Sequence, residues 1–439
     1  MPWFGGSAAV WTACMLFFQV ALLLGYLYAD ASIRFLKPKA QVILHLFLLG
    51  ACLFLLPIVP GGGWKPSPSQ DPNLRILALL AATVGLPYLV LSTTSPLLQA
   101  WYVRTYRNAM PYRLFALSNA GSMIALLSYP VAVEPFFAVR GQAVAWSAGF
   151  LFFGLLCATA ALRSRSEEPG RMDAAAEEGD ARPGWGMRIL WMALAACAST
   201  LLLAVTNHLT QNVAAIPFLW VLPLSLYLLS FILCFSGEGR YLRWVYLPLL
   251  MLALGGMSFL LSEGQETARL EILVPIFAGG LFVCCMVCHG ELAEMKPHPR
   301  HLTSYYLMIS LGGAVGGIFV GLVAPYGFRG YYELPAGIAA CAALTLVVLV
   351  RLRPPGSPIS RRRAATLLLA TTCTVGLAGL LAWQIRETTR DARVLARNFY
   401  GVLKVSDSGP PDSDRTMRTL VHGTITHGRQ FLSPPRRLH

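Results

Sequence analysis

Residues 206–223 read TNHLTQNVAAIPFLWVLP and lie between two long apolar segments near the middle of the chain. A transmembrane helix needs about 20 apolar residues, and each flanking segment has roughly that length. No long soluble loop separates the two segments, so the polar residues Asn207, His208 and Gln211 should lie at or just inside the membrane edge. Polar groups at that depth need hydrogen-bonding partners or a wet cavity. Two interpretations remain open: a tight turn solvated by lipid headgroups, or a pocket for a small polar ligand between two halves of the protein.

The composition extends the membrane interpretation to the whole chain. Of its 439 residues, 56% are apolar and 13% are charged, whereas about a quarter of the residues in soluble domains are charged. The apolar runs are continuous rather than alternating, which excludes a transmembrane β-barrel. The formal charge of +14 is spread over short loops, and no basic–aromatic groove or helix-turn-helix spacing indicates nucleic acid as a partner. The sequence predicts an all-α polytopic membrane protein whose main partner is the lipid bilayer.

Twelve apolar segments are candidate spans. They cover residues 7–28, 40–60, 74–95, 114–133, 142–162, 188–205, 213–235, 244–261, 272–289, 303–325, 334–350 and 364–383. The loops after odd-numbered spans hold twenty Lys and Arg residues, and those after even-numbered spans, before the tail, hold five. This bias places the odd loops in the cytoplasm and both Met1 and the C-terminal tail outside it. We expect a multi-pass membrane protein.

The spans are expected to form two six-helix halves. The first half covers residues 1–162, with helix 188–205 as its sixth span, and the second half covers residues 206–383. Residues 163–187 between them carry mixed charge, Gly and Pro, which is typical of a flexible cytoplasmic linker. Residues 99–130 and 290–325 both run from a basic loop through a Gly cluster to a terminal Pro. This echo has the offset of a six-span duplication, although two helical hairpins can also resemble each other by chance.

A cysteine motif lies at the end of the ninth span. The sequence CMVCH at residues 285–289 matches the C-x-x-C-H pattern of covalent haem attachment, and its thiols and imidazole are also soft-metal ligands. The motif lies in an apolar run on the expected cytoplasmic side, opposite to the face where such haem is attached. We therefore expect Cys285 and Cys288 to be packing residues, with no metal and no cofactor. His289 and Glu291 are candidates for a polar role at the cytoplasmic rim, the alternative being a solvated helix end.

Other polar residues complete the candidate sites. Glu134 follows the fourth span at the outer membrane edge, where a carboxylate is a functional candidate. We expect it to share one ligand-binding cavity with the polar residues of the central junction, Asn207, His208 and Gln211. Single polar residues within spans should each make one helix–helix hydrogen bond; these are Gln19, Gln99 and Asn119. Small residues at four-residue spacing predict close helix packing on the tenth span; these are Gly312, Gly313, Gly316, Gly317 and Gly321. No nucleophile elbow, P-loop or G-x-G-x-x-G motif is present, so no catalytic residue is assigned.

The tail, residues 384–439, is polar and basic. Residues 399–405 and 417–423 alternate as two strands around a turn rich in Ser, Gly, Pro and Asp, which predicts a β-hairpin. A hairpin of this size is marginal alone and normally belongs to a larger sheet.

The tail segments RNFYGVLKV (397–405) and LVHGTITHGRQ (420–430) resemble the start of a spermidine synthase-like domain. The spans resemble the membrane region of bacterial proteins in which a major-facilitator-like region is fused to that polyamine aminopropyltransferase-like domain. The similar segments are residues 2–19, 112–122, 206–231 and 288–317. The resemblance implies a role for Gln430 near a nucleoside ligand, and it places His422 and His427 where the family has an Asp-Gly context.

The Rossmann-like catalytic domain of that family does not follow in this sequence. We therefore expect a chain that is truncated or split relative to the family and not catalytically competent alone, with a separate synthase-like domain as its partner. Two alternatives stay open: a transporter of a small polar or cationic solute, and a structural membrane anchor for a partner enzyme.

Overall fold

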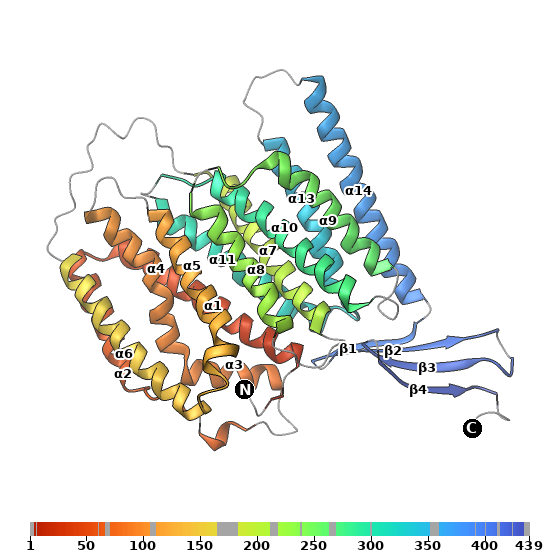
Figure 1. Ribbon diagram of the computed structural model, residues 1–439, viewed down its shortest axis with the longest axis horizontal. Helices are drawn as coiled ribbons and strands as arrows, with labels where there is room; N and C mark the ends of the chain where they lie inside the picture. The colour runs from red at the N-terminus through yellow and green to blue at the C-terminus, as the bar shows by residue number, and fades with distance from the viewer. Residues whose placement is uncertain are drawn as a thin grey trace.

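The computed structural model describes residues 4–5, 7–59, 61–65, 71–105, 111–164, 183–210, 218–237, 239–262, 269–298, 301–351, 360–390, 392–399, 401–410, 413–423 and 425–433. A bundle of helices makes up most of the molecule, and one sheet adjoins the C-terminal end of the last helix (Figure 1). The helices of the first part are α1 (Ala8–Phe35), α2 (Pro38–Leu53), η1 (Gly62–Trp64), α3 (Pro72–Thr83), α4 (Gly85–Thr105), α5 (Pro111–Ser128), η2 (Tyr129–Val133) and α6 (Val139–Ser164). Those of the second part are α7 (Trp185–Thr210), α8 (Phe218–Phe235), α9 (Arg243–Ser262), α10 (Leu270–Glu294), α11 (Leu302–Ile318), η5 (Phe319–Val323), α12 (Ala324–Gly327), α13 (Glu333–Arg351) and α14 (Arg361–Arg390).

Many of these helices are long and apolar enough to cross a membrane. Within the described ranges ten helices meet this criterion of length and composition. The helices α3 and α4 meet it as a pair, but the chain bends by 73° between them, and α2 is shorter, with 16 residues. The chain is therefore an all-α multi-pass membrane protein with a small sheet. The predicted number of twelve spans is not confirmed by this criterion.

Local sequence explains where several helices begin and end. The Ser7 side chain accepts a hydrogen bond from the Val10 amide and caps α1, as serine does at many helix starts. At the start of α3, the Asp71 carboxylate accepts bonds from two backbone amides and Pro72 occupies the first turn, where its missing N–H costs nothing. The chain bends where α3 ends and Gly85 opens α4. What the sequence presented as one span, residues 74–95, is thus two helices.

Helix α7 is the most enclosed element of the bundle. Leu201, Leu203 and Val205 on it are fully buried, and its most extensive contacts are with α11, followed by α10 and α13. The sequence assigned this helix, as residues 188–205, to the first half. By packing it belongs with the helices of the second half, because its apolar surface surrounds the whole helix and allows neighbours on every side. We therefore distinguish an N-terminal group, α1–α6, from a C-terminal group, α7–α14.

Glycines on α11 and η5 allow neighbouring helices to approach closely, as predicted. A Cβ atom at Gly316 would lie 2.7 Å from the Ala196 carbonyl oxygen on α7. Gly312 also faces α7, while Gly317 and Gly321 face α1. A Cβ atom at Gly313 would meet nothing within 4 Å. The close-packing prediction is thus confirmed for four of these five positions, and Gly313 faces open space.

The two groups share an arrangement that supports the internal duplication. In a six-span repeat, α1 corresponds to α8 and α5 corresponds to α11. In the structure α1 packs extensively against α11, and α5 packs extensively against α8. These two contacts are equivalent under the repeat, because exchanging α1 with α8 and α5 with α11 converts one contact into the other. In addition, α5 continues directly into the π-helix η2, and α11 continues directly into the π-helix η5, each of five residues. The two parts of the chain thus share these helix contacts and this local helix geometry.

Both described ends of the chain lie at the same end of the bundle (Figure 1). Ser7, at the start of α1, and Phe399, in the sheet region, line one pocket. The chain reaches the opposite end at the beginning of α2, where Gln41 donates a hydrogen bond to Ser32 near the end of α1. It has returned by α3, where Ile76 packs in one cluster with Val10. The segment from α2 to α3 therefore runs from one end of the bundle to the other.

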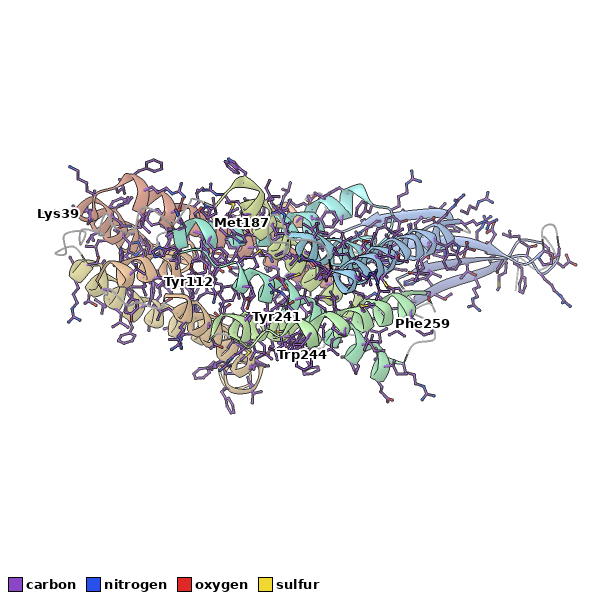
Figure 2. The ribbon with its side chains drawn as sticks, turned by 90° about the horizontal axis from the view of Figure 1, so that it is seen from above. Lys39, Tyr112, Met187, Tyr241, Trp244 and Phe259 are labelled. Atoms are coloured by element: carbon purple, nitrogen blue, oxygen red, sulfur yellow. The ribbon has the colours of Figure 1, made fainter. Side chains whose placement is uncertain are left out.

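The C-terminal region contains more regular structure than predicted. The strands are β1 (Ala392–Asn398), β2 (Gly401–Ser408), β3 (Met417–His422) and β4 (Ile425–Phe431). They form one antiparallel sheet in the order β1-β2-β3-β4. The predicted hairpin of two strands corresponds to β2 and β3, whereas β1 and β4 were not predicted, because their sequences ARVLARN and ITHGRQF lack strong apolar alternation. Helix α14 also continues to Arg390, past the predicted end at residue 383. Seen from above, the sheet lies at one end of the molecule and Lys39 at the other (Figure 2).

Candidate functional site

A large cavity lies between the N-terminal and C-terminal groups. Its volume is about 1630 Å³, more than the 300–1,000 Å³ of a typical small-molecule pocket. Its wall comes mainly from α1, α4, α5 and α6 on one side and from α8 and α11 on the other. No Asp, Glu, Lys or Arg is among the residues that line it in the described part of the chain. The wall is instead aromatic and neutral-polar, and includes Phe18, Gln19, Tyr26, Tyr88, Ser95, Gln99, Asn119, Tyr227, Phe231 and Ser310.

Two polar atoms in this wall have no hydrogen-bond partner among the described residues. The Gln19 side-chain amide donates a bond of 2.9 Å to Ser199 of α7, which leaves its carbonyl oxygen Oε1 buried and unpaired among the described residues. The hydroxyl of Ser310 on α11 is likewise buried and without a described partner. Unsatisfied buried polar atoms are costly, and native proteins commonly satisfy them with water or a ligand. Both atoms are enclosed in the cavity wall, and the Gln19 oxygen lies against Gly317 of α11.

The predicted helix–helix hydrogen bonds are confirmed at two of three positions. Gln19 joins α1 to α7 through Ser199. Gln99 on α4 accepts a bond of 3.0 Å from the hydroxyl of Tyr306 on α11. Asn119, in contrast, donates to the backbone carbonyl of Phe115 in its own helix. The sequence identified the cavity residues Gln19 and Gln99 as polar groups inside spans, but it did not indicate that they share a cavity.

A second, smaller pocket of about 290 Å³ lies where the sheet meets the bundle. Asn207 lines it from the end of α7 and accepts a hydrogen bond of 2.8 Å from Thr12 of α1. The sheet contributes Arg397 and His422 to the same pocket. The central junction of the sequence therefore lies at the interface between membrane region and sheet.

The other residues of the predicted cavity lie elsewhere. His208 is buried, and its ring packs 4.3 Å from the ring of Phe277 on α10. Glu134 caps the end of η2, is exposed, and lines neither of the two cavities described here. Gln211 lies outside the described residues. Of the four predicted residues, Asn207 lines one of these two cavities, and His208 and Glu134 line neither.

A buried ion pair joins the sheet to the bundle beside this pocket. The Arg397 guanidinium on β1 donates two bonds of 2.8 Å to the two carboxylate oxygens of Glu333 on α13. Their side chains are 4% and 2% exposed. Arg397 also bonds to the Gly330 carbonyl and lies 4.7 Å from the ring centroid of Tyr331. Burial raises the pKa of Tyr331, so its ring stays neutral beside the cation. Sequence reasoning did not identify this pair.

The predicted rim residues His289 and Glu291 are buried rather than solvated. His289 Nδ1 lies 2.8 Å from the hydroxyl of Ser230, and its ring stacks on Phe231 with centroids 3.6 Å apart. Because Phe231 lines the large cavity, His289 lies directly behind its wall.

Glu291 anchors the loop before α9. It accepts bonds of 2.7 and 2.8 Å from Arg243 and one of 3.0 Å from the Tyr241 hydroxyl. Burial and the neighbouring carboxylate raise the pKa of Tyr241, which therefore remains a hydrogen-bond donor.

Gln430, which the family resemblance placed near a nucleoside, lies on the exposed strand β4 opposite Arg418 of β3. His422 and His427 lie on neighbouring strands with ring centroids 5.6 Å apart. The described part of the sheet presents β4 at its open edge.

No model of a protein family, no curated protein and no solved structure matches this chain.

Proposed function

We propose that the chain is a membrane transporter that binds a small amphipathic solute in the large cavity between its two groups of helices. The observation that carries this proposal is the cavity of about 1630 Å³, bounded by α1 and α5 from one group and by α8 and α11 from the other. Transporters built from internal repeats bind substrate at the interface between the repeats. The interchanged contacts and the paired π-helices support such a repeat here.

The composition of the cavity wall narrows the solute class. A solute with several positive charges would need carboxylates to offset the cost of leaving water, and none is among the described lining residues. Aromatic faces can stabilise a single cation, and the wall also contains neutral polar side chains such as Ser95 and Asn119. We therefore propose a solute that is neutral or carries one positive charge and has an apolar surface, rather than a polyamine.

The same proposal includes twelve membrane crossings. Ten helices and the bent pair α3–α4 give eleven candidate crossings in the described ranges. Both described chain ends lie at one end of the bundle, which supports an even number of crossings. The segment beginning with α2 runs between the two ends, so counting it as a crossing satisfies this condition. With the charge bias of the loops, the sheet then lies outside the cytoplasm of a bacterial inner membrane.

A cavity-filling substitution tests the transport proposal. Gly313 lines the cavity and faces open space, so Gly313→Trp should fill the site while the helix packing remains intact. Purified protein in lipid nanodiscs should bind the monocationic amphipathic dye rhodamine 6G saturably, and Gly313→Trp should weaken this binding at least about tenfold, a change of about 1.4 kcal/mol. The control is Gly376→Trp on the exposed face of α14, which also faces open space. Equal binding by the two variants would contradict the proposal.

A second candidate function is the membrane region of a spermidine synthase-like protein. It is favoured by the docked four-stranded sheet, whose strand β4 leaves an open edge carrying Gln430. In this proposal a separate synthase-like domain associates with the sheet, and the membrane region anchors it. Affinity-tagged chain isolated from its native cells should retain a protein with a Gly-rich strand–helix motif, and deletion of residues 392–433 should release that protein. Retention that does not depend on the sheet would count against this candidate.

A further inference from the structure

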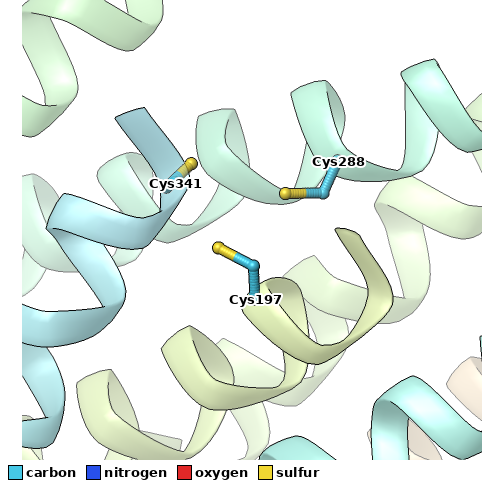
Figure 3. A group of neighbouring side chains, drawn as sticks. All are labelled: Cys197, Cys288 and Cys341. Carbon is cyan, nitrogen blue, oxygen red and sulfur yellow. The ribbon is translucent and has the colours of Figure 1, made fainter. Parts of the chain in front are cut away.

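Three cysteine side chains from three different helices converge inside the C-terminal group. They are Cys197 of α7, Cys288 of α10 and Cys341 of α13, and their sulfur atoms all lie within 4.8 Å of one another. Figure 3 shows the three side chains pointing toward a common centre. Packing cysteines have no need to direct their sulfur atoms toward one point, so this convergence requires its own explanation.

The surroundings of this cysteine triad are dry and apolar. The three residues are 5%, 1% and 0% exposed in the order of their numbers. They belong to the main hydrophobic cluster of the bundle, with fully buried Leu201 and Ile338 on the same helices. His289, adjacent in sequence to Cys288, is bonded to Ser230 instead. Among the described residues, the potential metal ligands that converge at this point are therefore the three sulfur atoms.

We propose that the triad binds Cu(I). Thiolates select soft ions such as Cu(I) and Zn(II), but structural zinc sites are almost always four-coordinate, whereas Cu(I) accepts three sulfur ligands. With metal–sulfur bonds of about 2.3 Å, as for zinc thiolates, a three-coordinate planar site separates its sulfur atoms by about 4.0 Å. The observed limit of 4.8 Å accommodates this separation with small side-chain movements.

The protons and charges of such a site balance as follows for Cu(I) bound by all three sulfur atoms. Ligand thiols lose their protons on binding, so Cu(I) bound by two thiolates and one neutral thiol releases two protons to water and carries one net negative charge. No electron is transferred. The bound ion would link α7, α10 and α13, and this site is independent of the proposed solute cavity.

Metal retention by the full-length protein tests the site. Protein purified in detergent under anaerobic, reducing conditions is incubated with Cu(I), desalted in the presence of a weak chelator, and analysed by elemental mass spectrometry. The expected result is about one copper per chain, and its loss in the variant Cys197→Ala/Cys341→Ala. The matched control is Cys52→Ala/Cys157→Ala, which removes two buried cysteines of the N-terminal group and should retain copper.

A second measurement does not depend on the folding of any variant. The copper X-ray absorption spectrum of the wild-type protein should show a shell of sulfur atoms without nitrogen or oxygen ligands. The assignment would be overturned if the triad variant bound as much copper as wild type or if the protein retained no metal. A stoichiometric preference for Zn(II), or nitrogen or oxygen ligands in the spectrum, would also overturn it.

Discussion

The ion pair between Arg397 and Glu333 should control how firmly the sheet is held on the bundle. Both side chains are almost fully buried and are joined by two parallel hydrogen bonds of 2.8 Å. Glu333→Gln preserves the shape of the side chain but removes its charge. It leaves the Arg397 cation buried without a counter-ion, which costs about 3–5 kcal/mol in comparable buried pairs. The remaining bond to the Gly330 carbonyl and the contact with the Tyr331 ring favour the lower end of this range.

A loss of about 3 kcal/mol raises the population of the detached sheet by about a hundredfold, since each 1.4 kcal/mol is a factor of ten. Hydrogen–deuterium exchange reports this population, because amides in a locally opened unit exchange according to its opening free energy. Peptides covering β1 and β2 should therefore exchange about a hundredfold faster in Glu333→Gln. Peptides from the centre of α7, which is distant from the sheet in sequence and deeply buried, should not change.

Two control variants separate this effect from a general loss of stability. Asp407→Asn breaks an exposed pair within the sheet, and such pairs contribute little to stability because water and salt screen them, so exchange should rise far less than in Glu333→Gln. Glu333→Leu combined with Arg397→Met removes both charges, and exchange should return toward the wild-type rate because no unpaired charge remains. Exchange in Glu333→Gln within threefold of wild type would refute the reasoning.

Three further predictions concern helix packing, pH and the loop before α9. Gly316→Leu should reduce the yield of folded protein and lower its melting temperature in detergent, because the side chain would meet the α7 backbone. The control Gly313→Ala should leave both quantities unchanged. Equal melting temperatures for the two variants would contradict this prediction. The hydrogen bond from Arg418 lowers the pKa of Asp407, so the pair stabilises the sheet above the ordinary aspartate pKa of about 3.9 and loses this contribution as pH falls through the lowered value. Once exchange rates are divided by the intrinsic amide rates, which themselves depend on pH, acidification should lower the opening free energy of the sheet less in Asp407→Asn than in wild type. Glu291→Gln should destabilise the protein by about 3 kcal/mol, because it unpairs a partly buried arginine, and a change in unfolding free energy below about 1 kcal/mol would show that water screens that charge.

The sequence was sufficient for the positions of most helices. Continuous apolar runs bounded by charge or proline locate helix ends to within a few residues, as for α10, expected at 272–289 and observed at Leu270–Glu294. The sequence did not indicate which helices pack against one another. The helix α7 is apolar on all sides, so no stripe indicates which neighbours it has, and its place in the C-terminal group depends on the packing of the whole bundle.

The candidate sites show the same limit. Glu134 and Glu333 are both carboxylates at the ends of apolar segments, yet the first is exposed and the second is buried against Arg397. The difference comes from the docked sheet, whose strand β1 was not predicted. The cysteine triad was missed for a related reason. Cys288 belongs to the closely spaced motif at residues 285–289, but its spatial partners Cys197 and Cys341 are distant in sequence and lie on other helices.

The paired π-helices η2 and η5 have a consequence for the history of the chain. A π-helix closes its hydrogen bonds over five residues instead of four, so it accommodates one residue more than the α-helix it interrupts. Both groups contain this extra residue at the end of the corresponding helix, after α5 and after α11. If two six-span repeats, with α7 counted as the last span of the first, descend from one shorter ancestor that carried this insertion, then the insertion is older than the duplication. A protein of half the length, with the same interruption in its fourth helix and assembled as a dimer, would then be the form from which this fold arose.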